Sequence, residues 1–143
     1  MWVKVQQIFP TFAGKLSNNS FMPKKNPAVE KLADIVVQGM LEKKAHKIVK
    51  IDLRNLTSAV TDIMLICHGD SDRQVSAIAE SVIDEVKKQT GENPFGKEGF
   101  AVGEWVLVDY VNVVVHVFKS EMRSFYALED LWADGDFQEI TNE

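Results

Sequence analysis

Gly69-Asp70-Ser71-Asp72 is the segment whose residue types come closest to those of a catalytic centre. A strand that ends in a glycine turn with carboxylates two residues apart can hold metal ions for phosphoryl transfer. However, Ser71 and Gln74 also form a capping-box pattern, and an acid such as Asp72 is favoured in the first turn of a helix. No second carboxylate pair accompanies Asp70 and Asp72 on another expected strand. We therefore interpret the segment as a helix start, with a nucleotidyltransferase-like, metal-dependent phosphoryl-transfer enzyme as the alternative.

The other polar candidates do not form a recognisable reactive group. Cys67 and His68 are a potential nucleophile and base, but adjacent residues of a strand point to opposite faces. The three histidines, His46, His68 and His116, share no metal-type spacing with Cys67 or with acids on one helix. The sequence contains neither a Walker A motif nor a GxGxxG glycine pattern. It thus predicts no metal site, no cofactor and no catalytic residue.

Residues 105–118 offer a surface for a partner instead. Two apolar stretches, 105–110 and 113–118, are separated by Val111-Asn112 and predict an antiparallel hairpin, although Val is a poor residue for a turn position with positive φ. One face of this hairpin belongs to the core, and it carries Val106, Val108, Tyr110, Val113, Val115 and Val117. The opposite face, called the mixed face below, carries Trp105, Leu107, Asp109, Val114, His116 and Phe118.

The mixed face has the composition of an interface centre, because it is apolar enough to need cover and polar enough to select a partner. We take Trp105, Leu107, Asp109 and His116 as the candidate partner-binding residues. A C-terminal helix folded over the same face explains the composition equally well, since aromatic residues are enriched both in cores and in interfaces. The sequence leaves these two alternatives open.

The hydrophobic pattern places these segments in a mixed α/β fold. Asn26-Pro27 is a helix start, and apolar residues at steps of three and four extend this helix to about Lys44. Residues 63–67 are continuously apolar, which is typical of a strand near the middle of a covered sheet. The expected elements are helices over 27–44, 72–90 and 120–132, strands over 47–53, 61–67, 105–110 and 113–118, and a loop over 92–103 with room for a short edge strand. We expect a mixed β-sheet of about five strands packed with helices.

Length and composition indicate one domain with two less regular ends. The chain has 143 residues, 45% of them hydrophobic, which suits a single domain. One cysteine cannot form an intramolecular disulfide, and no apolar stretch approaches the roughly 18 to 20 residues that span a bilayer, so we expect a reducing compartment and no membrane contact. Residues 1–25 lack periodicity, and we expect a disordered extension, with a transit peptide as the alternative. Residues 133–143 are expected to be a frayed acidic tail.

The net charge of -5 is unevenly distributed. Residues 1–25 contain four lysines and no acid, which leaves 12 basic against 21 acidic residues from Asn26 onward. This body has a net charge of -9 and is a poor ligand for nucleic-acid phosphates, because their binding depends on lysine and arginine. We therefore expect a basic protein partner and no direct DNA contact.

Four segments occur in an order and with a spacing that can be compared with known families: Ser71-Asp72-Arg73-Gln74-Val75, Trp105–Tyr110, Val113–Phe118 and Arg123–Trp132. Together they resemble the ribosomal silencing factor family, also called Iojap. The resemblance runs from about Pro27 to Trp132, so we assign residues 26–132 to a ribosomal silencing factor domain. The chain departs from the family at Val111-Asn112, where Gly-Asp is usual, at Asp62-Ile63-Met64, where Asp-Tyr-Phe is frequent, and in its N-terminal extension.

The resemblance implies a nucleotidyltransferase-like fold without a catalytic site and a non-enzymatic role. Members of the family bind a basic ribosomal protein, number fourteen in the universal scheme, on the intersubunit face of the large subunit. They prevent the small subunit from joining and so repress translation during starvation, and organellar relatives take part in large-subunit assembly. We accordingly expect a repressor in the bacterial cytoplasm, or in an organelle if the extension is a transit peptide. A homodimer, and a dimeric structural module without ribosome contact, stay open as alternatives.

Overall fold

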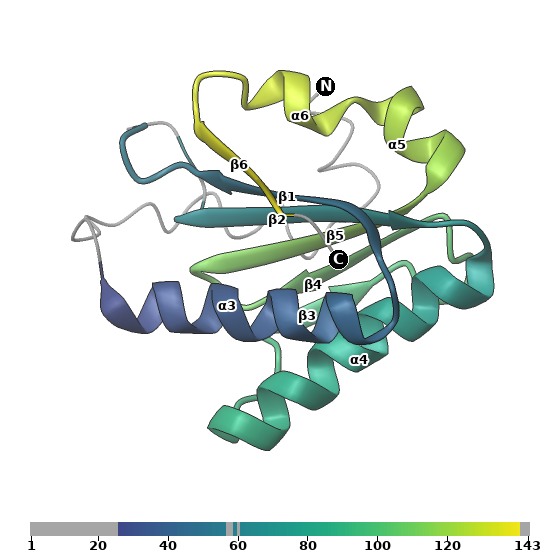
Figure 1. Ribbon diagram of the computed structural model, residues 1–143, viewed down its shortest axis with the longest axis horizontal. Coiled ribbons are helices and arrows are strands. Elements are labelled where there is room, and N and C mark those ends of the chain that lie inside the picture. Colours follow the sequence, from purple (N-terminus) through teal and green to yellow (C-terminus); the bar gives the residue numbers. More distant parts are fainter. Residues whose placement is uncertain (1–25, 57–58, 60, 141–143) are drawn as a thin grey trace.

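In the part of the chain that the computed structural model describes, residues 26–140 apart from 57, 58 and 60, a six-stranded mixed sheet has helices on both faces (Figure 1). The strand order is β3-β4-β5-β2-β1-β6, with β2 and β5 parallel and the other neighbours antiparallel. The strands are β1 (His46–Asp52), β2 (Ile63–Gly69), β3 (Gly96–Glu98), β4 (Trp105–Asp109), β5 (Val113–Lys119) and β6 (Asp136–Ile140). The predicted mixed α/β class is confirmed, with six strands in place of about five.

Two long helices cover one face of the sheet, and both begin where the sequence predicts (Figure 1). α3 (Pro27–Glu42) follows Asn26, whose side-chain oxygen accepts a hydrogen bond from the Ala28 amide at 3.0 Å. α4 (Asp72–Thr90) follows Ser71, whose hydroxyl accepts from the Gln74 amide at 3.1 Å. α4 ends at Gly91, where a φ of 80° closes the helix in the left-handed conformation that glycine adopts freely.

The opposite face is covered by two short helices where the sequence predicted one. α5 (Ser120–Tyr126) and α6 (Leu128–Leu131) are separated by Ala127, which has a φ of 47°. A residue in this left-handed conformation cannot continue a right-handed helix. The chain therefore turns at Ala127, and the side chains of Leu128 and Trp132 are buried against the sheet.

The C-terminal segment corrects the prediction of a frayed tail. β6 pairs with β1 in an antiparallel register that begins with Ile140 opposite Ile48. Only Ile140 of β6 is partly buried, so the strand lacks the apolar alternation by which strands are found in sequences. This segment is a strand because its backbone pairs with β1. The pattern of its own side chains does not predict that pairing.

The N-terminal extension, residues 1–25, lies outside the described residues, and so do residues 141–143 of the expected tail. Within the described part of the chain, every helix is too short or too polar to cross a membrane.

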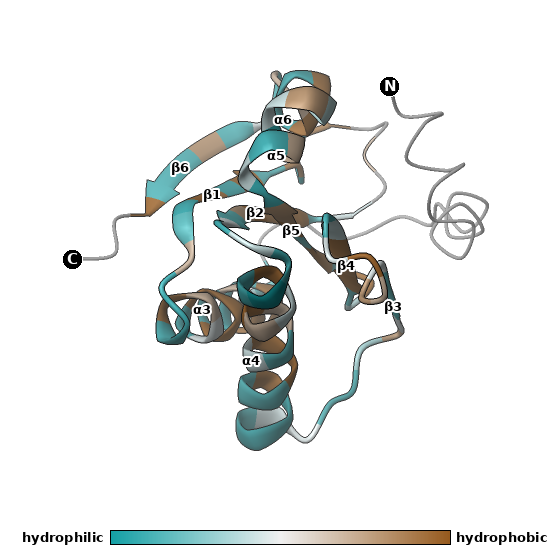
Figure 2. Cartoon of the chain, turned by 90° about the vertical axis from the view of Figure 1, so that its right-hand side faces the viewer, coloured by the Kyte–Doolittle hydropathy of each residue, from teal (hydrophilic) through white to brown (hydrophobic). Residues whose placement is uncertain are grey.

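The sheet separates two apolar cores (Figure 2). On β2, Ile63, Leu65 and Cys67 face α3 and α4, whereas Met64 and Ile66 face the other core, and all five are 0% exposed. The hairpin of β4 and β5 divides as predicted, with its valine-rich face toward α3 and α4. The predicted central strand and the predicted two faces of the hairpin are thus confirmed.

Close packing at Gly39 brings α3 and α4 together. The Ser81 hydroxyl of α4 donates a hydrogen bond to the Gly39 carbonyl oxygen at 2.8 Å. A Cβ atom at position 39 would lie 2.7 Å from the Cα atom of Val82. Because that obstacle is backbone, only a separation of the two helices could relieve the clash.

We expect Gly39→Ala to destabilise the protein by about 1 to 3 kcal/mol, the usual cost of overpacking, although alanine is the better helix former. The measurement is the free energy of unfolding in urea. Asp34→Ala, at an exposed position of the same helix, is the control and should stay within about 0.5 kcal/mol of the parent. An unchanged or higher stability of Gly39→Ala would contradict the close contact.

An ion-pair cluster connects α3 to β1 and to the turn that follows it. Lys50 bonds Glu30 at 2.9 Å, and Arg54 bonds both Glu30 and Asp52, the latter at 2.7 Å. The Arg54 side chain is only 4% exposed. Hydrogen bonds from Lys50 lower the pKa of Glu30, and those from Arg54 lower the pKa of Asp52. Both carboxylates therefore stabilise the fold in their charged form.

We expect this ion-pair cluster to make part of the free energy of unfolding sensitive to acid. A carboxyl group whose pKa is lower in the folded state stabilises the protein above its unfolded pKa, and the contribution is lost as the pH falls through the folded value. The ordinary pKa values are 4.5 for Glu30 and 3.8 for Asp52. Arg54→Met should cost about 1 to 3 kcal/mol at neutral pH, mostly through Asp52 because Glu30 is more exposed to solvent. Urea unfolding should show the difference from the parent narrowing below about pH 4; a difference independent of pH would contradict this role.

Candidate functional site

The mixed face of the hairpin, which carries the four candidate partner-binding residues, is covered in the structure. Trp105 is 5% exposed, Leu107 1%, Asp109 3% and His116 0%. Their side of the sheet packs against the C-terminal segment, whose apolar residues include Met122, Tyr126, Leu128, Leu131 and Trp132. The structure therefore does not leave this face open to a partner, and binding by these four residues stays untested. The alternative explanation, a C-terminal helical cover, is what the structure has.

Contacts inside this core give the polar members of the mixed face structural roles. The indole N–H of Trp105 donates a hydrogen bond to Nδ1 of His116 at 3.0 Å. The Trp105 ring lies 4.5 Å from that of Tyr126 and 4.8 Å from that of Phe118, measured between centroids. Asp109 accepts a hydrogen bond from the Val111 amide at 2.7 Å and so holds the hairpin turn. The combination of Trp, His and Asp on one sheet face therefore serves packing and turn formation.

Asp70 and Asp72 lie at the start of α4 and are each paired with a base. Oδ2 of Asp70 is 3.0 Å from Nε2 of His46, and Oδ1 of Asp72 is 3.1 Å from Nζ of Lys119. A hydrogen bond from Lys119 lowers the pKa of Asp72. Across the described residues, no three His, Cys, Asp or Glu side chains are grouped to hold a metal ion. This geometry matches the interpretation of the segment as a capped helix start.

Cys67 and His68 point to opposite faces of β2, as predicted for neighbours on a strand. Cys67 is fully buried in the core beneath α3 and α4, and burial raises the pKa of its thiol to about 12. His68 lies on the other face, where burial and then the charge of Arg123 lower its pKa. The two side chains are not assembled into a nucleophile and base.

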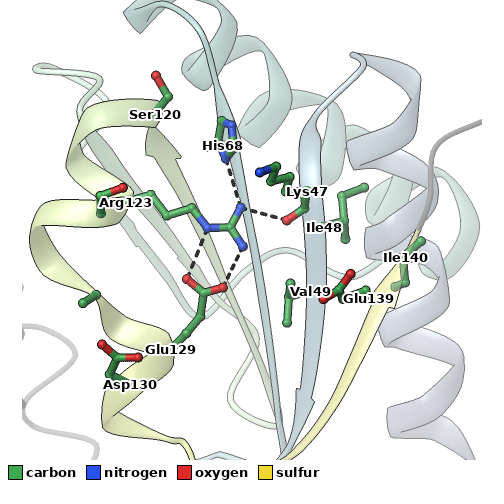
Figure 3. Close-up of a pocket in the computed structure, with 12 residues that line it drawn as sticks. Lys47, Ile48, Val49, His68, Ser120, Arg123, Glu129, Asp130, Glu139 and Ile140 are labelled. Carbon is green, nitrogen blue, oxygen red and sulfur yellow. Dashed lines mark hydrogen bonds and ion pairs between the residues drawn. The ribbon is translucent and has the colours of Figure 1, made fainter.

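Arg123 of α5 is the centre of a polar network that the sequence analysis did not single out (Figure 3). Its guanidinium bonds both carboxylate oxygens of Glu129, at 3.2 and 2.9 Å, and donates to the Lys47 carbonyl oxygen at 2.7 Å. It also lies 3.0 Å from Nδ1 of His68, which accepts this hydrogen bond because a guanidinium has only donors. These bonds fix α5 to α6, to β1 and to β2.

A groove of about 810 Å³ opens around Arg123 (Figure 3). Its floor includes Ile48 and Val49 of β1, and its walls come from α5, α6 and β6. The Arg123 side chain is only 11% exposed and its donors are engaged by neighbours. The polar groups of this groove therefore join the C-terminal helices to the sheet. A sequence signal for this network exists, because Arg123 and Glu129 both fall in the segment Arg123–Trp132.

Exposed apolar side chains gather at one end of the hairpin. Phe95, just before β3, is 66% exposed, and Val111, in the turn between β4 and β5, is 44% exposed. Both are tied to the same residue, since the Phe95 amide donates to the Asp109 carbonyl oxygen at 2.7 Å and the Val111 amide to the Asp109 carboxylate. Val111 has a φ of 74°, an unfavourable conformation for a β-branched residue. The predicted two-residue turn is thus present despite the side chain that disfavours it.

Comparison with known proteins decides the family. A sequence model described as ribosomal silencing factor during starvation matches residues 26–143. This chain belongs to the ribosomal silencing factor family. The ribosomal silencing factor of Bacillus subtilis is 45% identical over 102 residues, covering 69% of this chain and 82% of the relative.

Solved structures agree with this assignment. A crystal structure of a protein from Chromobacterium violaceum is similar with a TM-score of 0.69 and 36% identity, covering 73% of this chain and 86% of that chain. A crystal structure from Bacillus halodurans has a TM-score of 0.68 and 35% identity, covering 78% of this chain and 99% of that chain. The family model matches as far as residue 143 and therefore includes β6. The resemblance found in the sequence ended earlier, at Trp132.

Burial of Trp105 leads to a stability prediction. We expect Trp105→Ala to cost about 3 to 5 kcal/mol of unfolding free energy, because a large side chain is removed from a packed core. Chemical unfolding followed by circular dichroism measures the loss. Val102→Ala, at a residue that is 64% exposed, is the control and should change little. A Trp105→Ala protein as stable as the parent would show that the C-terminal cover is not held by this contact.

Proposed function

We propose that this protein binds the large ribosomal subunit through a basic ribosomal protein, number fourteen in the universal scheme, and blocks joining of the small subunit. The observation that carries the proposal is the family match over residues 26–143. Relatives that share up to 45% of the aligned residues bear the name ribosomal silencing factor. Repression then results from occupied space, because a folded domain seated on the intersubunit face excludes the small subunit without any reaction.

The charge of the folded body supports a basic protein partner. From Asn26 onward the chain has 21 acidic against 12 basic residues. Opposite charges on two proteins speed their encounter and disfavour wrong partners, although they add less to affinity than buried apolar contacts do. A basic ribosomal protein supplies the matching charge, whereas the apolar contacts must come from exposed side chains.

We place those apolar contacts at the turn end of the hairpin. Phe95 and Val111 are large, exposed and both hydrogen-bonded through their backbones to Asp109. A few side chains that a partner buries carry most of the binding energy of an interface, and exposed apolar side chains on a fixed backbone can serve in this way. Trp105, Leu107 and His116 lie in the core of the same hairpin, so we assign them, with Asp109, the role of supporting this surface from within.

Substitution of the two exposed residues tests the surface without disturbing the core. Phe95→Ser combined with Val111→Gly should weaken co-sedimentation with purified large subunits by at least about tenfold, as expected for central interface residues. Glycine at position 111 also relieves the positive φ, so the fold should be kept. The same variant should lose its block on association of the two subunits.

Val102→Ser is the matched control, because Val102 is equally exposed but lies in the loop before the opposite end of β4. It should bind and silence like the parent. Parent-like binding of the double variant would remove Phe95 and Val111 from the interface. Failure of the parent protein to sediment with large subunits would overturn the proposed function itself.

A further inference from the structure

Four exposed cations gather where α3 passes into β1 and where α4 begins. They are Lys43, Lys44, Lys47 and Arg73, called the basic turn below. All four side chains are exposed, and within the described residues none of them forms an ion pair. On a body with a net charge of -9, unpaired positive charge concentrated at one end of the sheet is unexpected from composition.

The backbone of the basic turn is held in a fixed shape. The Gln74 side-chain amide donates to the carbonyl oxygens of Lys43 and Lys44, at 3.2 and 3.3 Å, which ties the turn to the first turn of α4. The Ala45 amide donates to the Met40 carbonyl oxygen at 3.1 Å, and the Ala45 side chain is buried. The lysine side chains therefore extend from a rigid support, which lowers the entropy lost when they bind a partner.

Two lysines of the turn have backbone conformations that are rare for such residues. Lys44 has a φ of 59° and Lys47 a φ of 48°, in the left-handed region where glycine or asparagine is the usual choice. The pairing of β1 with β2 is irregular between His46 and Val49, so Lys47 sits in this irregularity. The positive φ of Lys44 ends α3, because the Lys44 amide donates to the Leu41 carbonyl oxygen at 3.0 Å in the usual left-handed helix end.

Acidic side chains lie near the basic turn, but those in ion pairs are paired with other bases. Asp70 contacts His46 at 3.0 Å, and Asp72 contacts Lys119 at 3.1 Å. Glu42, at the end of α3, is exposed and is the one acidic residue within the sequence 42–47. Lys43 also lines a groove with Glu80, Asp84 and Glu85, and Lys47 lines another with Asp130 and Glu139. Within the described residues, none of these acids forms an ion pair with the basic turn, so its ammonium and guanidinium groups are open to a phosphate.

We propose that the basic turn binds the phosphate backbone of ribosomal RNA beside the protein contact made by the apolar residues. The inference rests on the proposed ribosome binding and adds a second class of partner to it. Lysine and arginine on a rigid turn suit phosphates, because such contacts need positive charge and fixed position but no base recognition. The acidic remainder of the body would be repelled by RNA, so contact is confined to this end and orients the protein on the subunit.

The salt dependence of large-subunit binding tests the proposal. The variant Lys43→Gln, Lys44→Asn, Arg73→Gln removes three charges, keeps the backbone acceptors of Gln74, and places at position 44 a residue that tolerates positive φ. Between about 50 and 200 mM salt, the slope of log affinity against log salt should become shallower by about 1 for each phosphate that the variant no longer neutralises. The control Lys31→Gln, Lys87→Gln removes exposed charges of α3 and α4 away from the basic turn and from Phe95, and it should keep the parent slope.

A slope that is unchanged in the first variant, or equally reduced in the control, would overturn the inference. In both cases the parent still binds the subunit, so the proposed function would stand. A parent that fails to bind overturns both proposals.

Directed cleavage separates RNA from an acidic protein as the ligand. Cys67 is 0% exposed, so Glu42→Cys supplies the reactive thiol of the described chain and leaves every lysine of the turn in place. An iron chelate attached there should cleave ribosomal RNA in the bound large subunit, and one attached at Asp34→Cys, an exposed site earlier on α3, should cleave it less. Retained binding without RNA cleavage from position 42 would assign the basic turn to a protein partner and overturn the inference.

Discussion

The parallel pairing of β2 with β5 is the constraint on which the rest of the fold depends. Ile63 to Cys67 on β2 and Val113 to Phe118 on β5 are 0% exposed on both faces of the sheet. A parallel pair cannot be closed by a tight turn, so α4, β3 and β4 lie between these strands in the sequence. Two apolar faces also require cover on both sides, which α3 and α4 provide on one side and α5 and α6 on the other.

This constraint explains why the polar residues at the ends of the central strands serve the fold. The carboxyl ends of parallel strands are where α/β proteins usually place ligands. In this protein the groups at that end are matched within the structure: Asp70 with His46, Asp72 with Lys119, and Arg123 with Glu129 and His68. The Arg123 network holds α5 and α6 over the sheet. The same contacts therefore pair the polar groups at the strand ends and keep the mixed face covered.

Charge is segregated over the surface in a way that suits a protein working by position. Most of the body is acidic, whereas the basic turn lies at the junction of α3, β1 and α4. Apolar exposure at Phe95 and Val111 lies at the turn end of the hairpin. Under the proposed function, a factor that occupies an intersubunit face needs an anchored orientation more than it needs a reactive centre. Separate apolar and cationic contacts would supply that orientation.

Much of the fold was determined by local sequence. The caps at Asn26 and Ser71, the stop at Gly91 and the two faces of the hairpin follow from hydrogen-bonding side chains, glycine and residue alternation, all of which act within a few positions. The ordered motifs from Ser71 to Trp132 were also sufficient to indicate the family that the comparisons show.

Tertiary structure decided the features that depend on distant neighbours. β6 has exposed side chains and is a strand only because the edge of β1 accepts it, and Ala127 divides the last helix so that Leu128 and Trp132 can reach the sheet. Burial of Trp105 and His116 likewise depends on where that C-terminal segment folds. The same composition suits a core and an interface, because both remove apolar area from water. Only the position of the covering helices shows which one a face has become.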